Sequence, residues 1–386
     1  MGGIAVVVGG GVGGLTTAIG LRRIGWEVTV LERAPVLADV GGGISLHANG
    51  IRALDALGIG PAIRAAIRPQ YTGGTRTSAG RWLARLDGAE LERRLGAPVA
   101  GIRRAELLRV LCSALPKDRV MVGAEVESVD RSDPARVRVL LGDGGTLDAD
   151  LIVAADGVNS RLRAGLFPGH PGPAYSGTTV LRATTPGPIA LDSDLELTWG
   201  RGAEFGHLTF ADGRVEWHAV LNSPPGVRHP DPLAFLRARC DGWHDTVTTL
   251  LGATEPDAVL HHDIHELTDP LPAFTADRIA LLGDAAHAMT PNLGQGASQA
   301  LEDAAALAAA LASEPTLTSA LTRYDAERRP RSQSVARAAR LAGRMGQQLT
   351  NPVAVTLRNT ALRMAPSGAT LRAFLRHAAW TPPVLA

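Results

Sequence analysis

The first thirty residues constrain the fold of this chain more than any other stretch. Residues 4–8 form an apolar, mostly β-branched run that is typical of a parallel strand buried on both faces. The run leads directly into Gly9, Gly11 and Gly14, spaced as G-x-G-x-x-G, and then into apolar residues at helical spacing. A second strand at residues 27–31 ends at Glu32. This order predicts a βαβ unit of the Rossmann type, which binds a dinucleotide.

Each part of this unit has a physical role toward such a ligand. The first glycine permits the tight turn, the second lets the backbone approach a pyrophosphate, and the third lets helix and strand pack closely. The helix N-terminus offers free N–H groups to the phosphates, and Glu32 is placed to accept hydrogen bonds from ribose hydroxyls. A glycine-rich turn without a ligand is the alternative interpretation, but it leaves the register of strands, helix and acid unexplained.

Length and charge narrow the class of protein. A chain of 386 residues predicts two domains, which could be interleaved. The formal charge of +1 argues against nucleic acid as a partner, and two cysteines give no disulfide framework or cysteine metal cluster. No apolar run reaches the roughly twenty residues of a membrane span. Because the chain starts with a strand and leaves no room for a signal peptide, we expect a cytoplasmic location.

Two further buried strands end in an acid. Residues 151–155 precede Asp156-Gly157, and residues 279–282 precede Gly283-Asp284. Open sheets bind ligands at the carboxyl ends of parallel strands, although Asp156 could equally be a helix N-cap. A constrained loop, residues 291–296, then leads into a long helix whose N-terminus favours negative charge.

Several other stretches allow more than one interpretation. The triplet Gly41–Gly43 could bring backbone against a flat ligand or form a flexible loop, and Asn49 is a plausible N-cap for a helix through Leu57. Arg104 lies in the first turn of a predicted helix opening at Ile102, where either a nearby anion or a solvated surface position would explain it. Residues 71–87 predict hairpins, and residues 120–150 predict a meander.

The middle of the chain predicts a second, antiparallel sheet. Residues 175–221 alternate in polarity, with Asp212-Gly213 as a hairpin turn, and residues 232–239 and 243–251 have helical spacing. His261, His262 and His265 lack the H-x-x-x-H spacing and partner acid of a zinc site, so we predict an ordinary strand there and no metal.

The motifs taken in order resemble those of the single-component FAD-dependent aromatic hydroxylases, the group typified by para-hydroxybenzoate, salicylate and 3-hydroxybenzoate 6-hydroxylases. The resemblance rests on the G-x-G-x-x-G pattern, Arg104, Asp156-Gly157, Gly283-Asp284 and residues 291–296, and it covers roughly residues 4 to 340. It implies an α/β fold in which a Rossmann-like FAD-binding domain with a parallel sheet (1–70, 98–170 and 270–345) is interleaved with a smaller antiparallel substrate domain (71–97 and 171–269). Residues 346–386 would form a helical C-terminal segment.

The resemblance also implies FAD and NAD(P)H as cofactor and co-substrate, and hydroxylation by O2 of a phenolic or polyketide-like aromatic molecule through a flavin hydroperoxide. Epoxidation, Baeyer–Villiger oxidation and FAD binding without hydroxylation remain alternatives, because fold does not fix chemistry. A monomer and a homodimer are both open. The implied FAD contacts are Gly9, Gly11, Val12, Gly13, Gly14, Glu32, Arg33, Gly43, Ile44, Arg104, Asp156, Gly157, Gly283, Asp284, Pro291, Gly294, Gln295 and Gly296.

Candidates for the substrate site come from the sheet expected to face the flavin and from the 291–296 loop. They are Arg182, His207, His218 and Gln295. The two histidines lie on neighbouring strands and titrate near neutral pH, so each could orient a phenol, or each could be a half-exposed strand residue without such a role. Trp217 is expected to be core.

Overall fold

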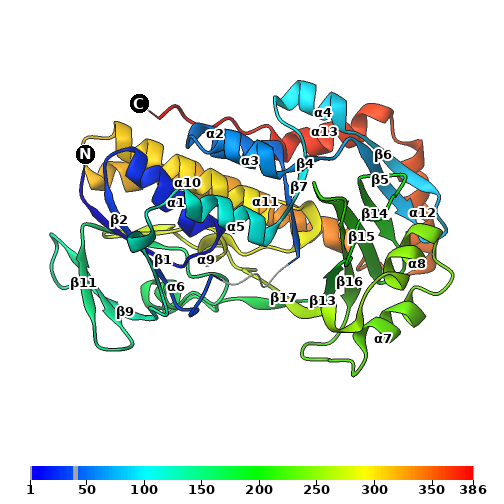
Figure 1. The fold of residues 1–386 in the computed structure, drawn as a ribbon, viewed down its shortest axis with the longest axis horizontal. Coiled ribbons are helices and arrows are strands. Elements are labelled where there is room, and N and C mark those ends of the chain that lie inside the picture. Colours follow the sequence, from blue (N-terminus) through cyan, green and yellow to red (C-terminus); the bar gives the residue numbers. More distant parts are fainter. Residues whose placement is uncertain (1, 38–41, 386) are drawn as a thin grey trace.

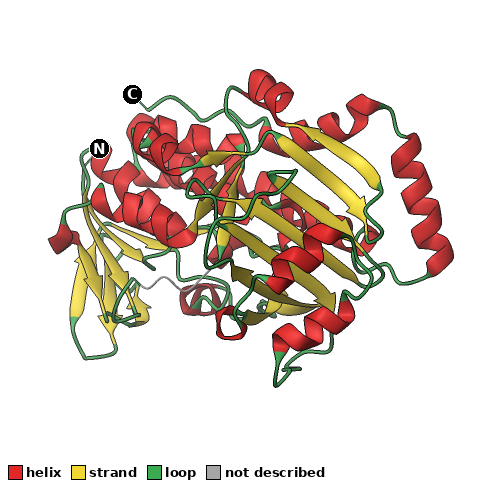
Figure 2. Cartoon of the chain, turned by 45° about the vertical axis from the view of Figure 1, so that its right-hand side comes forward, coloured by secondary structure: helices red, strands yellow, loops and turns green. Residues whose placement is uncertain are grey.

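Two large β-sheets of different kinds organise the molecule, which was analysed as a computed structural model describing residues 2–37 and 42–385 (Figure 1). The first sheet is surrounded by helices, and the second forms the right-hand part of Figure 1, with helices α7, α8 and α12 around it. The two views together show the C-terminal helices returning along this second part (Figure 2).

The first sheet has six strands in the order β18-β19-β12-β1-β2-β8. Its strands are β1 (Ile4–Val8), β2 (Glu27–Glu32), β8 (Val120–Val122), β12 (Leu151–Ala154), β18 (Thr275–Ala276) and β19 (Ile279–Leu281). The pairs β1–β2, β1–β12, β12–β19 and β2–β8 are parallel. The predicted βαβ unit is therefore confirmed, and the three strands that lead to Gly9, Asp156 and Asp284 are direct neighbours.

Helices and a small meander cover this sheet. Figure 1 shows α1, α5, α10 and α11 stacked above it, with the meander below. The helices are α1 (Val12–Arg23), α2 (Ala48–Ala56), α3 (Gly60–Ala66), α5 (Arg104–Ser113), α6 (Arg161–Leu166), α9 (Asp284–His287), α10 (Gly296–Ser313) and α11 (Leu317–Met345). The meander consists of β9 (Val126–Asp130), β10 (Val137–Leu141) and β11 (Thr146–Ala149). One apolar core joins the sheet to these helices.

The second sheet has seven strands in the order β17-β13-β16-β15-β14-β5-β6 and is antiparallel except for the β5–β14 pair. Its strands are β5 (Thr72–Thr77), β6 (Trp82–Asp87), β13 (Ala174–Thr184), β14 (Leu195–Trp199), β15 (Ala203–Thr209), β16 (Val215–Asn222) and β17 (Leu260–Glu266). Helices α7 (Pro232–Arg239) and α8 (Asp245–Gly252) pack on one face, where Trp217 stacks on Phe205 at 5.5 Å between ring centroids. The prediction of Trp217 as core is confirmed, and the three histidines of residues 261–265 lie on a strand, as predicted.

The remaining elements connect the two sheets. They are β3 (Gly43–Leu46), β4 (Arg68–Pro69), β7 (Ala100–Arg103), α4 (Gly88–Leu95), α12 (Pro352–Met364), α13 (Ser367–Ala378) and the 3-10 turns η1 (Lys117–Arg119), η2 (Pro256–Ala258) and η3 (Pro291–Leu293). Helix α13 contacts α4 and β6 at the edge of the second sheet, whereas Trp380 and Leu385 after it pack against the core around the first sheet. Among the residues that the structure describes, no helix combines the length and apolarity of a membrane span.

Four local predictions were wrong in instructive ways. The N-cap of α2 is His47, and Asn49 instead directs its side chain to buried partners in α10 and the preceding loop. Residues 100–103 pair as a strand, so α5 begins at Arg104 and not at Ile102. Residues 120–122 add a parallel edge strand beside β2, because β2 offers free backbone groups there, and the meander begins only at residue 126. Helix α8 likewise begins at Asp245, two residues later than the apolar spacing indicated.

Candidate functional site

A cavity of about 270 Å³ lies where β1 and β12 end, and we call it the glycine-loop cavity. It brings together seven residues predicted from three separate parts of the sequence: Gly9, Gly11, Glu32, Arg33, Arg104, Asp156 and Gly157. Its other lining residues are Val8, Leu31, Ala124, Glu125, Val126, Ala155, Asn159 and Arg161. Parallel pairing explains this convergence, because β1, β2 and β12 all end at the same edge of the sheet.

The glycines of the loop are required by close approaches of backbone to backbone. Gly9 has a φ of +112°, and a Cβ there would lie 2.2 Å from the carbonyl oxygen of Ala155. A Cβ on Gly14 would lie 1.9 Å from the carbonyl oxygen of Gly9, so only glycine allows α1 to pack this tightly on β1. A Cβ on Gly11 would meet nothing within 4 Å. At Gly9 and Gly14 the loop therefore packs too closely on other backbone atoms to allow a side chain, whereas at Gly11 it is open toward the cavity.

Two acids line the same cavity, and their carboxylate oxygens can accept further hydrogen bonds. The Glu32 carboxylate accepts hydrogen bonds from the backbone N–H groups of Gly10 at 2.7 Å and Ala34 at 2.8 Å, one on each oxygen. The Oδ2 atom of Asp156 accepts from Leu162 N at 3.3 Å, whereas Oδ1 is buried and has no hydrogen-bond partner. Ser160, not Asp156, is the N-cap of α6. An unsatisfied buried carboxylate oxygen in a cavity fits a ligand that donates a hydrogen bond.

Arg104 lines the glycine-loop cavity from the first residue of α5. A cation in the first turn of a helix interacts unfavourably with the helix dipole. An anion bound in the cavity would offset this unfavourable interaction. Of the glycine triplet, Gly43 begins β3 and Gly42 accepts a backbone hydrogen bond from Arg104 N at 3.2 Å, whereas Gly41 lies outside the described residues.

A second cavity, of about 290 Å³, lies between the 291–295 loop and the second sheet, and we call it the histidine cavity. Its lining residues are Ser45, His47, Leu195, Leu197, Glu204, His207, Leu208, His218, Pro291, Asn292, Leu293, Gly294, Gln295 and His377. The walls therefore come from β3, β14, β15, β16, the η3 loop and α13. Six of these fourteen residues are aliphatic, proline or glycine, and the other eight are four histidines, two amides, Ser45 and Glu204.

The loop side of the histidine cavity is rigidly held. Gly294 has a φ of +61° and passes directly over His47, because a Cβ there would lie 2.9 Å from His47 Nε2. Gln295 is buried, and its Oε1 atom accepts hydrogen bonds from Asn49 Nδ2 at 2.9 Å and Gln299 Nε2 at 3.2 Å. The side-chain amide N–H groups of Gln295 are thus what it can offer to a ligand.

On the sheet side, His218 lies next to an ionised buried carboxylate. Its Nδ1 atom is 3.5 Å from Glu216 Oε2, and Arg182 Nη2 is 2.7 Å from Glu216 Oε1. Burial alone would raise the pKa of Glu216, but Arg182 and His218 outweigh burial and lower it. Gly206 makes room for the imidazole, because a Cβ there would lie 2.4 Å from His218 Nε2. Nε2 of His218 can therefore form a hydrogen bond with a ligand in the cavity, while the Glu216 carboxylate lies next to Nδ1 of the same ring.

The structure separates the two histidines that the sequence grouped together. His207 borders the cavity, but strand alternation puts it on the face of β15 opposite to Glu204 and Leu208. Its Nε2 atom lies 3.1 Å from the carbonyl oxygen of Ser193, and burial lowers its pKa to about 4. The alternative in which both histidines orient a substrate overlooked this alternation. Arg182 is also outside the cavity lining and binds Glu216 and the carbonyl oxygen of Gly43.

The third predicted strand end is that of β19, which pairs with β12 and leads to Gly283 and Asp284. Gly283 has a φ of +59° and is the N-cap of the four-residue helix α9, which starts at the exposed Asp284. The backbone N–H of Gly283 donates to Asp303 Oδ2 at 3.0 Å. Gly13 packs against this segment, because its Cβ would lie 2.6 Å from Leu282 Cδ2. Asp284 is therefore free to bind a ligand, while the backbone around it is anchored in α10.

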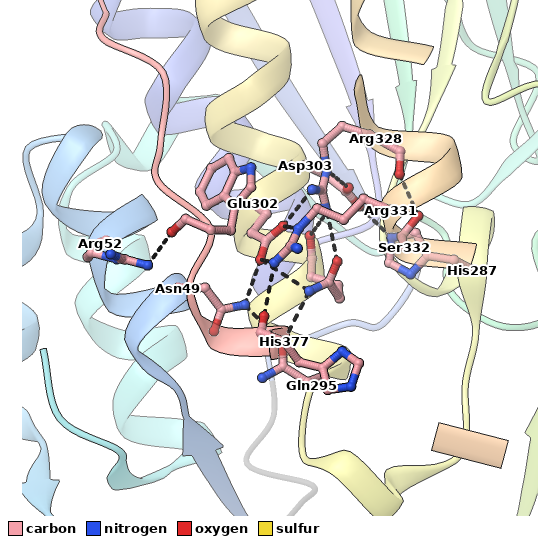
Figure 3. Close-up of polar contacts among 12 residues, drawn as sticks. Asn49, Arg52, His287, Gln295, Glu302, Asp303, Arg328, Arg331, Ser332 and His377 are labelled. Carbon is pink, nitrogen blue, oxygen red and sulfur yellow. Dashed lines mark hydrogen bonds and ion pairs between the residues drawn. The ribbon is translucent and has the colours of Figure 1, made fainter. Parts of the chain in front are cut away.

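A buried charged network beneath this loop was not predicted from the sequence (Figure 3). Glu302 and Asp303 of α10 are fully buried, and Asp303 lies 2.7 Å from Arg328 Nε and 2.6 Å from His287 Nε2. Burial alone would raise the pKa of Asp303, but His287 and Arg328 outweigh burial and lower it to about 2. The sequence signal that could have indicated this network is a pair of adjacent acids inside an alanine-rich helix. Acids buried in such a helix require cationic partners.

Glu302 links the loop side of the histidine cavity to the end of the chain. Its Oε1 atom accepts from Asn49 Nδ2 at 2.6 Å, which in turn binds Gln295. The same carboxylate lies 2.6 Å from Arg331 Nε, and Arg331 Nη2 donates to the carbonyl oxygen of His377 at 2.9 Å. One side chain thus helps to position two walls of the cavity.

The glycine-loop cavity fits the adenosine and pyrophosphate part of FAD. The open face at Gly11 and the cation at Arg104 suit phosphates, while Glu32 and the unsatisfied Asp156 Oδ1 suit hydroxyl donors. The 291–295 loop and the N-terminus of α10 then border the histidine cavity, where a flavin ring and a substrate would meet.

Comparisons with known proteins agree with this geometry. The FAD binding domain family matches residues 4–339. Aurachin C monooxygenase/isomerase of Stigmatella aurantiaca is 36% identical over 379 residues, which cover 98% of this chain and 98% of that protein. The 3-amino-4-hydroxybenzoate 2-monooxygenase of Streptomyces cremeus is 36% identical over 345 residues, which cover 86% and 85% of the two chains. The crystal structure of Klebsiella pneumoniae HpxO complexed with FAD and uric acid has a TM-score of 0.91 and 26% identity, and the match covers 98% and 97% of the two chains. The chain therefore belongs to the FAD binding domain family, as a member of its flavin-dependent aromatic monooxygenases.

Proposed function

We propose that this flavoprotein hydroxylates a small aromatic molecule in the histidine cavity, with NAD(P)H as the reductant and O2 as the oxidant. The observation that carries the proposal is the pairing, across one cavity, of the 291–295 loop with His218 of the second sheet. The overall reaction converts an arene, O2, NAD(P)H and a proton into a hydroxyarene, NAD(P)⁺ and water. Bound FAD supplies the redox chemistry of this reaction.

The protein residues have three tasks in such a reaction. His218 takes the proton of a phenolic substrate, and the ionised Glu216 behind it stabilises the resulting imidazolium. The rigid turn at Gly294 and the aliphatic walls at Leu195 and Leu197 exclude water from the reacting atoms. The backbone N–H groups at the start of α10 favour negative charge at the adjoining edge of the flavin.

We also infer which residues form the FAD-binding domain and which form the substrate-binding domain. Residues 1–70, 98–170 and 270–345 would bind FAD, and residues 71–97 and 171–269 would form the substrate domain. Two separate apolar cores support this division for residues 181–251, which form the core beneath the seven-stranded sheet, whereas Leu91 and Leu95 of the 71–97 segment pack in the core around the six-stranded sheet.

The test uses the FAD-loaded protein and a panel of phenols and hydroxylated heteroarenes. An arene that is a substrate should accelerate NADH or NADPH consumption and should gain one oxygen atom from labelled O2, as measured by mass spectrometry. Replacing His218→Asn should lower kcat, with unchanged flavin content. If no arene in the panel changes the rate of consumption, the protein is a flavin binder and the proposal fails. Oxygen inserted into the ring or across a double bond would instead identify Baeyer–Villiger oxidation or epoxidation.

A further inference from the structure

The histidine cavity contains no basic residue other than histidine among the described residues that line it. Lys117 is the only lysine of the chain and lies in η1. The four residues that the structure does not describe between positions 37 and 42 are Ala-Asp-Val-Gly, so they add no cation to this part of the chain. A carboxylate inside the cavity would therefore lack the charged partner that a buried anion requires.

Arg182 is the nearest candidate for such a partner, and Glu216 already neutralises its charge. Arg182 lies on the same face of the second sheet as His218, but its guanidinium binds Glu216 and the carbonyl oxygen of Gly43. Glu216 is 1% exposed, so this buried carboxylate already neutralises the charge of Arg182.

The acidic side chains in or near the cavity wall offer no positive charge to a bound carboxylate. Glu204 lines the wall, is buried, and accepts a hydrogen bond from Trp199 Nε1 at 2.5 Å. Burial raises the pKa of Glu204, so its own charge is already disfavoured in this environment. With Glu216 ionised next to His218, the cavity has two acids in or near its wall and no free cation among the residues described there.

Two further imidazoles in the cavity lining add no positive charge. Burial and the neighbouring His377 lower the pKa of His47 to about 4. Burial, Arg376 and Arg331 lower the pKa of His377. Both rings are therefore neutral at pH 7, and the neutral ring of His377 has one donor and one acceptor.

His377 reaches the cavity from the last helix of the chain, whose position is fixed through its backbone. Arg331 Nη2 donates to the carbonyl oxygen of His377, and Arg52 Nη2 donates to that of Ala378, each at 2.9 Å. Figure 3 shows the His377 ring near Gln295, and both residues line the cavity. Its side chain is therefore presented to the cavity by an anchored helix.

We propose that the histidine cavity selects an uncharged hydroxy- or oxo-arene and rejects carboxylated arenes, and that His377 determines this specificity by hydrogen bonding to a polar substituent of the substrate. This inference rests on the proposed function, because it assigns a substrate class to the same site. It also separates this chain from the benzoate-hydroxylating relative, whose named substrate has a carboxylate.

Matched pairs of arenes that differ in charge test the proposal by binding alone. The FAD-loaded protein is titrated at neutral pH with 3-hydroxybenzoate and its methyl ester, and with 1-hydroxy-2-naphthoate and its methyl ester, while flavin absorbance is followed. Each ester should bind at least about tenfold more tightly than its acid, because the acid must bury an unpaired charge. Equal or tighter binding of the acids, or no binding of either ester, would overturn the proposal. Because this assay needs no turnover, its result is independent of whether any arene is hydroxylated.

Substitutions at position 377 test the role of His377. His377→Arg introduces a cation and should shift the acid-to-ester preference toward the acids by at least about tenfold, whereas Arg372→Ala, at an exposed position of the same helix outside the cavity, should leave it unchanged. His377→Leu should weaken ester binding at least about fivefold, and His377→Gln should restore it. Unchanged binding in both His377→Arg and His377→Leu, with normal flavin content, would remove His377 from this role.

Discussion

Acid should destabilise this protein well before its carboxylates are protonated, because it contains two buried neutral histidines. His207 and His47 are both buried, and their pKa is lowered to about 4 from an ordinary value of 6.5. Burial is the leading cause for each. In the unfolded chain both residues bind a proton below pH 6.5, whereas in the folded chain they stay neutral down to about pH 4.

The sign and size of the effect follow from proton linkage. Their contribution to stability is fully present above pH 6.5 and is lost as the pH falls, because the unfolded state then binds more protons. Each histidine should lower the free energy of unfolding by about 1.4 kcal/mol for each pH unit in this window, and by about 3 kcal/mol in total. The loss should level off below about pH 4, where the folded state is protonated as well.

His207→Gln isolates one of the two contributions. Glutamine retains a donor for the carbonyl oxygen of Ser193 and has no titrating group. Urea unfolding of the FAD-loaded variant between pH 8 and pH 4 should give a pH dependence that is shallower by about 1.4 kcal/mol per pH unit below pH 6.5, with little change at pH 8. A variant whose pH dependence matches that of the wild type would refute the reasoning, because His207 would then not be neutral in the folded state.

The other predictions concern the cofactor site and the buried network. Gly14→Ala forces a Cβ to within 1.9 Å of Gly9 O, so the variant should purify with little flavin, as measured by absorbance. Glu32→Gln should raise the FAD dissociation constant about tenfold or more in a fluorescence titration, and an unchanged constant would exclude Glu32 from the ribose site. Arg328→Met removes the cation that two buried acids share, leaving Arg331 with Glu302 and His287 with Asp303, and should cost about 3–5 kcal/mol in urea unfolding, whereas Arg329→Met, on the surface of the same helix, should cost less than about 1 kcal/mol.

The features predicted well from the sequence are those determined by local pattern and by sheet topology. The glycine loop has a known spacing, and parallel pairing then brings Asp156 to the same edge as Gly9. The second sheet followed from alternation, which also puts Trp217 in the core. In these cases the physical cause, burial with a period of two or a turn that needs glycine, is contained in a few consecutive residues.

The features that were missed depend on contacts between distant residues. Asn49 has the chemistry of an N-cap, but its partners Gln295 and Glu302 are brought to it by packing of α2 on α10. His377 becomes a wall of the histidine cavity because Arg331 fixes the backbone of α13. No local pattern in the last forty residues indicates that position.

The anchoring of α13 has a practical consequence for engineering. The family match ends at residue 339, whereas the histidine cavity is completed by a side chain 38 positions later. A gene trimmed at the family boundary would encode the residues of the glycine-loop cavity yet remove one wall of the neighbouring compartment. Exchange of the tail after residue 345 between homologues is therefore a route to altered selectivity, provided that the exchanged tail keeps the packing of Ala378 in the core around the six-stranded sheet.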